Sequence, residues 1–257
     1  MSTDERTVQW YNEHAADYTE HVRNPNDSIY HSMYEKPAMY ALVPDLNDKS
    51  AISLGCGSGE DCNHLRQAGA KEVAGVDISS GLIGVAKASY PDCDFQVMDM
   101  EHLDFSDSSF DFAYSSLAMH YLETWDKVLG EAFRVLRPGS FFLFSCNHPM
   151  YSAMEVTRDD AEVKVQQLSR TRDIQTDTVT IIGDYVTRHS MELNDSWVTW
   201  HKSIGEISQE VTKAGFMIAG VHEPQPSPDM ASVSPKDYAT LLKIPNFVIF
   251  KLWKPTV

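Results

Sequence analysis

The chain has 257 residues, 42% of them hydrophobic and 23% charged, which is the composition of a globular protein large enough for one sizeable core. Its 37 acidic and 21 basic residues give a formal net charge of −16, and this acidity disfavours nucleic acid as the main partner. Because the chain has no basic-then-apolar leader, no run of about 18 apolar residues and four cysteines without metal-site spacing, we expect a cytoplasmic protein with reduced thiols, no membrane span and no bound metal.

Residues 1–46 are rich in aromatic side chains and are expected to form helices that cap the rest of the chain. From residue 50 to residue 147, short β-rich runs alternate with amphipathic segments. Strands are expected at 51–54, 71–77, 94–98, 110–114 and 140–145, and the last of these is nearly all apolar, as in a strand covered on both faces. Between the fourth and fifth strands, apolar residues three and four apart predict a helix that stops at Arg137-Pro138-Gly139.

The alternation breaks over residues 148–201, which mix polar and aromatic residues and are expected to form an insertion. It resumes with a helix over 204–214 and a strand over 216–221, a predicted loop from Pro224 to Pro235, and a last apolar strand over 247–253. The sequence therefore predicts one α/β domain with a doubly wound, seven-stranded, mainly parallel sheet. Its parts are an N-terminal helical cap (1–46), a core (47–147), an insertion after the fifth strand (148–201) and the C-terminal part of the sheet (202–257).

The strongest functional signal is the loop Leu54-Gly55-Cys56-Gly57-Ser58-Gly59-Glu60, which follows a predicted strand and precedes a helix. Glycines at such a place allow a tight turn and let the backbone approach a ligand closely. The dinucleotide pattern G-x-G-x-x-G/A would need Gly or Ala at position 60, and the carboxylate of Glu60 is unfavourable beside a pyrophosphate. The loop therefore favours a ligand without phosphates over NAD, with a glycine-rich turn that binds nothing as the alternative.

Two carboxylates end the next two strands. Asp77 stands 18 residues after Gly59, where a carboxylate at the end of a neighbouring parallel strand can accept hydrogen bonds from two ribose hydroxyls. It could instead cap the following helix, although Ser79 could do that itself. Asp99 could accept from an adenine amino group while the Met100 amide donates, or it could be a solvated carboxylate in a turn.

These segments resemble the successive motifs of class I S-adenosylmethionine-dependent methyltransferases of the small-molecule type. The resemblance covers residues 8–147 well and the remainder more loosely. Its order and spacing are what make it specific. The segments are Leu54-Gly55-Cys56-Gly57-Ser58-Gly59, Gly75-Val76-Asp77-Ile78-Ser79, Asp99-Met100-Glu101-His102-Leu103-Asp104-Phe105, Ser109-Phe110-Asp111-Phe112-Ala113-Tyr114-Ser115 and Phe133-Arg134-Val135-Leu136-Arg137-Pro138-Gly139.

The resemblance implies a Rossmann-like methyltransferase fold with S-adenosylmethionine as cofactor and S-adenosylhomocysteine as product. In such a fold the glycine loop faces the methionine part, Asp77 holds the ribose, and Asp99 with Met100 frames the adenine. Ser115 is expected near the sulfonium, and Tyr11 and Tyr18 are expected to cover the cofactor. The full set of implied cofactor-binding residues is Tyr11, Tyr18, Gly55, Cys56, Gly57, Gly59, Asp77, Ile78, Leu82, Asp99, Met100, Glu101 and Ser115.

One position departs from the family's pattern. The family usually has an acidic residue two positions before the first glycine, and this chain has Ser53. A serine could orient the loop and the methionine ammonium only through water and more weakly. This departure keeps a non-methylating S-adenosylmethionine-binding protein among the alternatives.

Methyl transfer from a sulfonium requires alignment first, and a general base only if the acceptor is protonated. Three histidines are candidates for that base. His120, after the fourth strand, is favoured by its position, and His148 and His201 are weaker candidates. Each could equally be a structural hydrogen-bonding residue.

The predicted function is methyl transfer to a small molecule by in-line displacement. Residues 148–201 are expected to act as a lid, whose Trp197 and Trp200 would either bind an aromatic acceptor or pack onto the sheet. A tRNA or protein methyltransferase of the same fold is an alternative that the acidity and the absence of a basic stripe disfavour. The sequence leaves a monomer and a homodimer both open, and it does not identify the acceptor.

Overall fold

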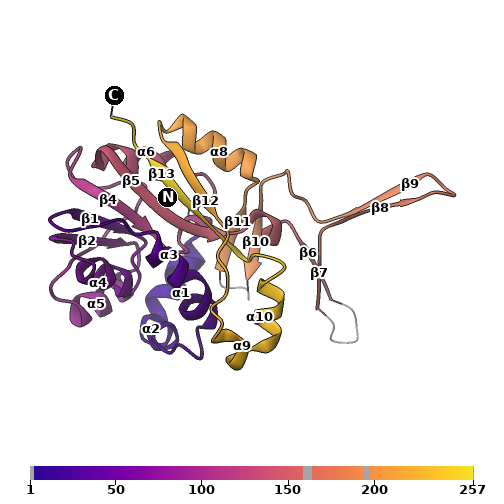
Figure 1. Cartoon of the computed structure of the whole chain (residues 1–257), viewed down its shortest axis with the longest axis horizontal. Coiled ribbons are helices and arrows are strands. Elements are labelled where there is room, and N and C mark those ends of the chain that lie inside the picture. The colour runs from indigo at the N-terminus through magenta and orange to yellow at the C-terminus, as the bar shows by residue number, and fades with distance from the viewer. Residues whose placement is uncertain (1–2, 159–163, 194–196, 257) are drawn as a thin grey trace.

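A seven-stranded sheet forms the centre of the computed structural model, which describes residues 3–158, 164–193 and 197–256 (Figure 1). The strand order is β12-β13-β5-β4-β1-β2-β3, and only β13 runs antiparallel to its neighbours. The predicted doubly wound, mainly parallel sheet is thus confirmed. Its strands are β1 (Ser50–Leu54), β2 (Glu72–Asp77), β3 (Asp94–Val97), β4 (Phe110–Ser115), β5 (Leu136–Asn147), β12 (Met217–His222) and β13 (Phe247–Trp253).

Helices cover both faces of this sheet because the central strands are apolar on both sides. One hydrophobic cluster joins α4 (Glu60–Gln67), α5 (Ser80–Ser89) and α3 (Lys36–Ala41) to alternate strand residues such as Phe112 and Leu143. The other joins α6 (Asp126–Val135) and α8 (Ile204–Lys213) to the residues between them, such as Ala113, Phe142 and Phe144. Neighbouring residues along β4 and β5 therefore enter opposite halves of the core.

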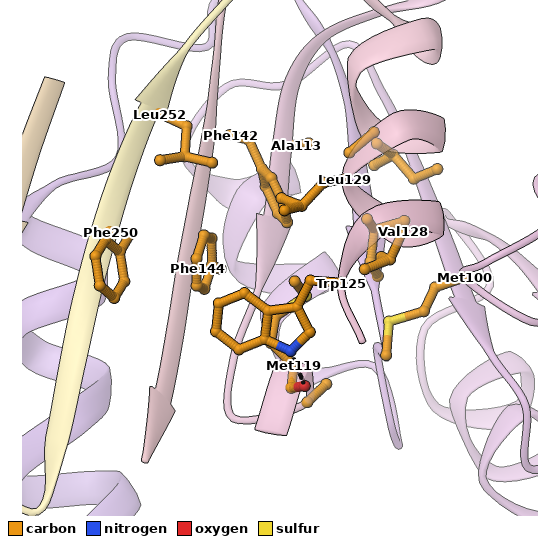
Figure 2. Packing of buried hydrophobic residues seen from close by; sticks show 14 of the residues in the cluster. Met100, Ala113, Met119, Trp125, Val128, Leu129, Phe142, Phe144, Phe250 and Leu252 are labelled. Carbon is orange, nitrogen blue, oxygen red and sulfur yellow. Dashed lines mark hydrogen bonds between the residues drawn. The ribbon is translucent and has the colours of Figure 1, made fainter. Parts of the chain in front are cut away.

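Trp125, directly before α6, anchors the second cluster (Figure 2). Its ring meets Phe144 edge to face at 5.4 Å, and its Nε1 donates to the Met119 carbonyl at 2.9 Å. Met119 begins the short 3₁₀ turn η2 (Met119–Tyr121), which follows the carboxyl end of β4. The buried tryptophan therefore fixes the turn that carries His120 to the edge of the sheet.

The N-terminal segment forms α1 (Glu5–Glu13), α2 (Ala15–Arg23) and the π-helical turn η1 (His31–Glu35), which continues into α3. Helices α1 and α2 both lie against α5, and α1 also contacts β11 (Trp197–His201). The Asp4 side chain caps α1 by accepting from the Arg6 amide at 2.9 Å. The segment therefore lies beside the carboxyl end of the sheet, where β1 and β2 end in the glycine loop and Asp77.

The insertion does not form a single layer over the sheet. It contains α7 (Pro149–Ser152) and three hairpins, β6 (Glu155–Arg158) with β7 (Lys164–Gln167), β8 (Ser169–Asp173) with β9 (Thr178–Ile182), and β10 (His189–Leu193) with β11. Strand β11 contacts α1 and η2, whereas β8–β9 projects away from the body of the molecule (Figure 1). At its tip Ile174 is 92% exposed.

Two further differences have local causes. Strand β5 begins at Leu136 and not at Ser140, because Gly139, at φ +85°, bonds its amide to the Lys254 carbonyl at 2.8 Å and keeps the segment paired. The stretch Pro224 to Pro235, predicted as a loop, contains α9 (Met230–Val233) and the first residue of α10 (Pro235–Leu241). Proline is well suited to a first helical turn, so Pro235 begins a helix. Among the described residues, no helix is long and apolar enough to cross a membrane.

Candidate active site

Two glycines of the loop have different surroundings, one packed against a side chain and the other beside open space. Gly59, at φ +92°, precedes α4, and a Cβ there would lie 2.7 Å from Cζ of Phe95, so this glycine is required by packing. Gly57 also has a positive φ, +54°, but a Cβ there would meet no atom within 4 Å. Gly57 therefore borders open space, and the loop presents its backbone to that space as expected for a ligand-binding turn.

Asp77 connects the end of β2 to the glycine loop. Its Oδ2 accepts from the Gly57 amide at 2.9 Å and its Oδ1 from the Ser79 amide at 2.8 Å. Burial raises the pKa of Asp77, and the amide donors oppose this shift. The cap of α5 is Ser79, whose Oγ accepts from the Leu82 amide at 3.2 Å. Helix capping therefore leaves the remaining lone pairs of the Asp77 carboxylate available to a ligand.

A pocket lies between the glycine loop, the ends of β2 and β3 and the first helix, and we call it the inner chamber. It encloses about 680 Å³ of space, part of which is open to solvent. Asp99 sits in the turn after β3, where its Oδ1 accepts from the Glu101 amide at 2.9 Å. Much of the remaining wall is apolar. The lining residues are Thr3, Thr7, Val8, Tyr11, Tyr18, Gly55, Gly57, Asp77, Ile78, Leu82, Met98, Asp99, Met100, Ser116, Leu117, Ala118 and Tyr121.

Nine of the thirteen residues expected to bind a cofactor line this chamber, and the other four do not. Cys56 lines the neighbouring cavity, and Gly59 packs against Phe95. Glu101 is buried at 2% exposure beside the Asp99 turn. Ser115 is fully buried inside the end of β4, and its neighbour Ser116 lines both cavities.

A larger pocket adjoins the first, and we call it the outer chamber. It encloses about 1510 Å³ of space, part of which is open to solvent. The two chambers share Tyr11, Tyr18, Tyr121 and part of the glycine loop. Its walls combine aromatic and titratable side chains. The lining residues are Trp10, Tyr11, His14, Asp17, Tyr18, His21, Val22, His31, Lys36, Gly55, Cys56, Gly57, Ser58, Glu60, Asp61, Ser116, Leu117, His120, Tyr121, Asn147, Trp197 and Phe247.

The three shared tyrosines form one aromatic group. The hydroxyls of Tyr11 and Tyr121 are 2.7 Å apart, and the Tyr11 ring meets that of Tyr18 edge to face at 5.1 Å. Trp197, from β11, stacks on Tyr11 at 6.3 Å. Burial raises the pKa of all three tyrosines, which therefore stay protonated and uncharged.

Of the three candidate bases, the structure brings only His120 to a chamber. Burial lowers the pKa of His120 to about 3, so its ring is neutral at ordinary pH. His148 accepts from the Met150 amide at 3.0 Å and so caps α7, and its other ring nitrogen lies 3.2 Å from Glu223. The ring nitrogens of His201 lie 2.6 Å from Ser152 Oγ and 2.9 Å from the Tyr185 carbonyl.

A polar cluster borders the outer chamber, and it was not predicted from the sequence. Glu35, fully buried in η1, accepts from Ser116 Oγ at 2.9 Å and Ser145 Oγ at 2.5 Å, and burial raises its pKa. Next to it, Lys36 pairs closely with Asp61 and donates to Ser116 Oγ at 3.1 Å. The only signal in the sequence was the run of titratable residues between His31 and Lys36. Ser53 lies 1% exposed within β1 and lines neither chamber.

Comparison with known proteins agrees with this geometry. Residues 52–144, which span β1 to β5, match a family model described as a methyltransferase domain. A crystal structure of an S-adenosylmethionine-dependent methyltransferase from Mesorhizobium loti is similar over 88% of this chain and 99% of that one, with 26% identity and a TM-score of 0.71.

Two curated relatives are similar in sequence. An uncharacterized protein of Haemophilus influenzae is 26% identical over 213 residues, which cover 77% of this chain and 79% of that protein. A malonyl-[acyl-carrier protein] O-methyltransferase of Pectobacterium atrosepticum is 31% identical over 107 residues. The latter match spans 42% of each protein, less than half of either length.

Proposed function

The chain is a class I S-adenosylmethionine-dependent methyltransferase, and we propose that it holds this methyl donor in the inner chamber and methylates a small molecule in the outer chamber. The observation that carries the proposal is the continuity of the two chambers, which share the glycine loop and three tyrosines. In-line displacement requires donor and acceptor to meet from opposite sides of one point. Two adjoining chambers supply that arrangement.

The residues of the inner chamber suit the donor. The open space above Gly57 would take the methionine part, and the remaining lone pairs of Asp77 would accept from the ribose hydroxyls. Asp99 and the Met100 amide would frame the adenine, with Leu82 supplying apolar contact. The roles of Cys56, Gly59, Ile78, Glu101 and Ser115, like the lid role of the insertion, stay predictions.

Once bound, the donor supplies an electrophilic methyl group on a positively charged sulfur. Tyr11, Tyr18 and Tyr121 favour such a charge at the junction of the chambers, because neutral aromatic rings attract cations by their faces. The hydrogen bond between Tyr11 and Tyr121 fixes two of these rings. His120 then lies on the acceptor side as a neutral hydrogen-bonding group.

The acceptor is proposed to be a small molecule. Trp10, Trp197 and Phe247 give the outer chamber apolar ring surfaces that suit a ring-bearing compound. The net charge of −16 supports a small acceptor over a nucleic acid. A tRNA or protein acceptor remains the alternative.

Calorimetric titration of the purified chain with S-adenosylmethionine, with NADH as control, tests the donor site. We expect micromolar binding of S-adenosylmethionine alone, followed by release of S-adenosylhomocysteine when pools of small acceptors are added. Absence of donor binding would refute the proposal. Donor binding without turnover on small molecules, tRNA or protein pools would favour the non-methylating alternative to which Ser53 points.

A further inference from the structure

We infer that His31 and His120 act together as a hydrogen-bonding pair that selects an uncharged acceptor with an N–H or O–H group over a carboxylate. The inference rests on the proposed function, since it concerns the acceptor side of that site. The two histidines come from segments far apart in sequence, the π-helical turn η1 and the 3₁₀ turn η2. Both side chains line the outer chamber.

His31 and His120 each have an unfulfilled hydrogen-bonding capacity. Nδ1 of His31 and Nδ1 of His120 are both buried, and neither has a hydrogen-bond partner within the described part of the chain. Buried polar atoms in native proteins almost always have partners, so each exception calls for an explanation, and these two belong to side chains that line a cavity. The indole Nε1 of Trp197, which lines the same chamber, is in the same condition.

The backbone that carries His31 has an unusual conformation. A π-helical turn is rare, and such turns occur frequently at functional sites. Here the turn places His31 at the chamber while its last residue, Glu35, is fully buried against Ser116 and Ser145. The turn therefore joins a chamber residue to the polar cluster at the base of the site.

The charge states of the side chains that line the outer chamber favour an uncharged acceptor. Burial lowers the pKa of His31 to about 4 and that of His120 to about 3, so both rings are neutral near pH 7. Lys36 is paired with Asp61, and Glu60 is paired with Arg23 at 2.7 Å. A carboxylate beside His31 and His120 would meet neutral rings and paired charges, whereas an uncharged N–H or O–H group could donate to an imidazole nitrogen.

The low pKa values also limit what the pair can do. Rings that bind protons so weakly are poor general bases, so we assign them as positioning residues that orient the acceptor. Their loss should therefore weaken acceptor binding and raise KM more than it lowers kcat at saturating acceptor.

The test measures binding of matched small probes to the protein saturated with S-adenosylhomocysteine. The uncharged probes are benzimidazole, indole and phenol, and the carboxylate probes are benzoate and phenylacetate. The variants are His31→Leu and His120→Leu, which remove the nitrogen, and His31→Asn and His120→Asn, whose amide keeps a polar atom near the position of Nδ1. His102→Leu, at an exposed histidine outside both chambers, is the matched control.

We expect at least one uncharged probe to bind at least tenfold more tightly than either carboxylate. Each leucine variant should weaken that probe by at least tenfold, while the asparagine variants and His102→Leu stay within about threefold of the wild type. Because the leucines remove unpartnered polar atoms, they should leave the melting temperature unchanged or higher. If an acceptor is then found by turnover, the leucine variants should show the KM effect.

Two results would overturn the inference while leaving the proposed function in place. One is donor binding with no uncharged probe bound, or with a carboxylate bound as tightly. The other is unchanged probe binding in both leucine variants. Failure of the wild type to bind S-adenosylmethionine or S-adenosylhomocysteine would instead refute the proposed function itself.

Discussion

Replacing Gly57 by alanine should separate fold stability from donor affinity. At φ +54° an L-residue costs about 1 kcal/mol, and the new Cβ would meet no protein atom within 4 Å. We therefore expect the free energy of unfolding to fall by about 1 kcal/mol, which lowers the melting temperature by about 2–4 °C at this chain length. Since Gly57 lines both chambers, the methyl group would occupy donor space. The Kd for S-adenosylmethionine should rise at least tenfold, or about 1.4 kcal/mol.

Calorimetric titration and thermal unfolding of the same preparation measure both quantities. Gly84→Ala is the matched control, because Gly84 lies within α5, lines neither chamber and also has open space around its Cβ position. Alanine there should stabilise the helix by about 0.5–1 kcal/mol and leave the Kd unchanged. If Gly57→Ala bound the donor as the wild type does, the loop would not face the donor. A stability loss above about 3 kcal/mol would show that the Cβ is not in open space.

Three further variants test neighbouring parts of the argument. Asp77→Asn should weaken donor binding at least tenfold, and urea unfolding should show a loss of about 1–3 kcal/mol, since an amide group cannot accept from both the Gly57 and Ser79 amides; equal affinity would remove Asp77 from the donor site. Gly59→Ala should cost about 1–3 kcal/mol by overpacking against Phe95, and Phe95→Leu in the same chain should recover part of it. The pKa of His31 is about 4 in the folded protein and about 6.5 in the unfolded chain. Below pH 6.5 the unfolded chain therefore binds a proton that the folded protein does not, and the free energy of unfolding decreases as the pH falls toward 4. His31→Asn should therefore lose up to about 3 kcal/mol less than the wild type between pH 6.5 and pH 4, at about 1.4 kcal/mol per pH unit, and parallel urea curves would contradict this.

The strands of the sheet could be predicted because their burial shapes their sequence. Strand β13 begins and ends where its apolar run does, and β1, β2, β3 and β4 each differ from the prediction by one residue at one end. The hairpin β8–β9 could not be predicted in the same way. Strand β8 alternates Arg170 and Arg172 with small polar residues, and β9 alternates threonine with valine and isoleucine. Both strands are exposed, so no buried face sets them apart.

Some residues of the site could likewise be predicted from the sequence, and others could not. The glycine loop, Asp77 and Asp99 were found because residues that end neighbouring parallel strands meet at one edge of a sheet, which the sequence order alone implies. His31 and Lys36 were missed because their place in the site depends on how the N-terminal segment folds against the ends of β4 and β5. His148 follows a strand as His120 does, and His201 precedes a helix, but both are engaged in local hydrogen bonds, His148 with the Met150 amide of α7 and His201 with Ser152 of α7 and the Tyr185 carbonyl.

The projecting hairpin β8–β9 offers a chemical handle on the protein. Cys56, Cys62 and Cys146 are buried, and burial raises the pKa of the Cys93 thiol to about 11, so these native cysteines are slow to react with alkylating reagents. A cysteine introduced at Gln175, in the exposed turn beside Ile174, would react selectively with a maleimide. A dye or a surface linker attached there would stand clear of both chambers, so donor and acceptor binding could be followed on tethered single molecules.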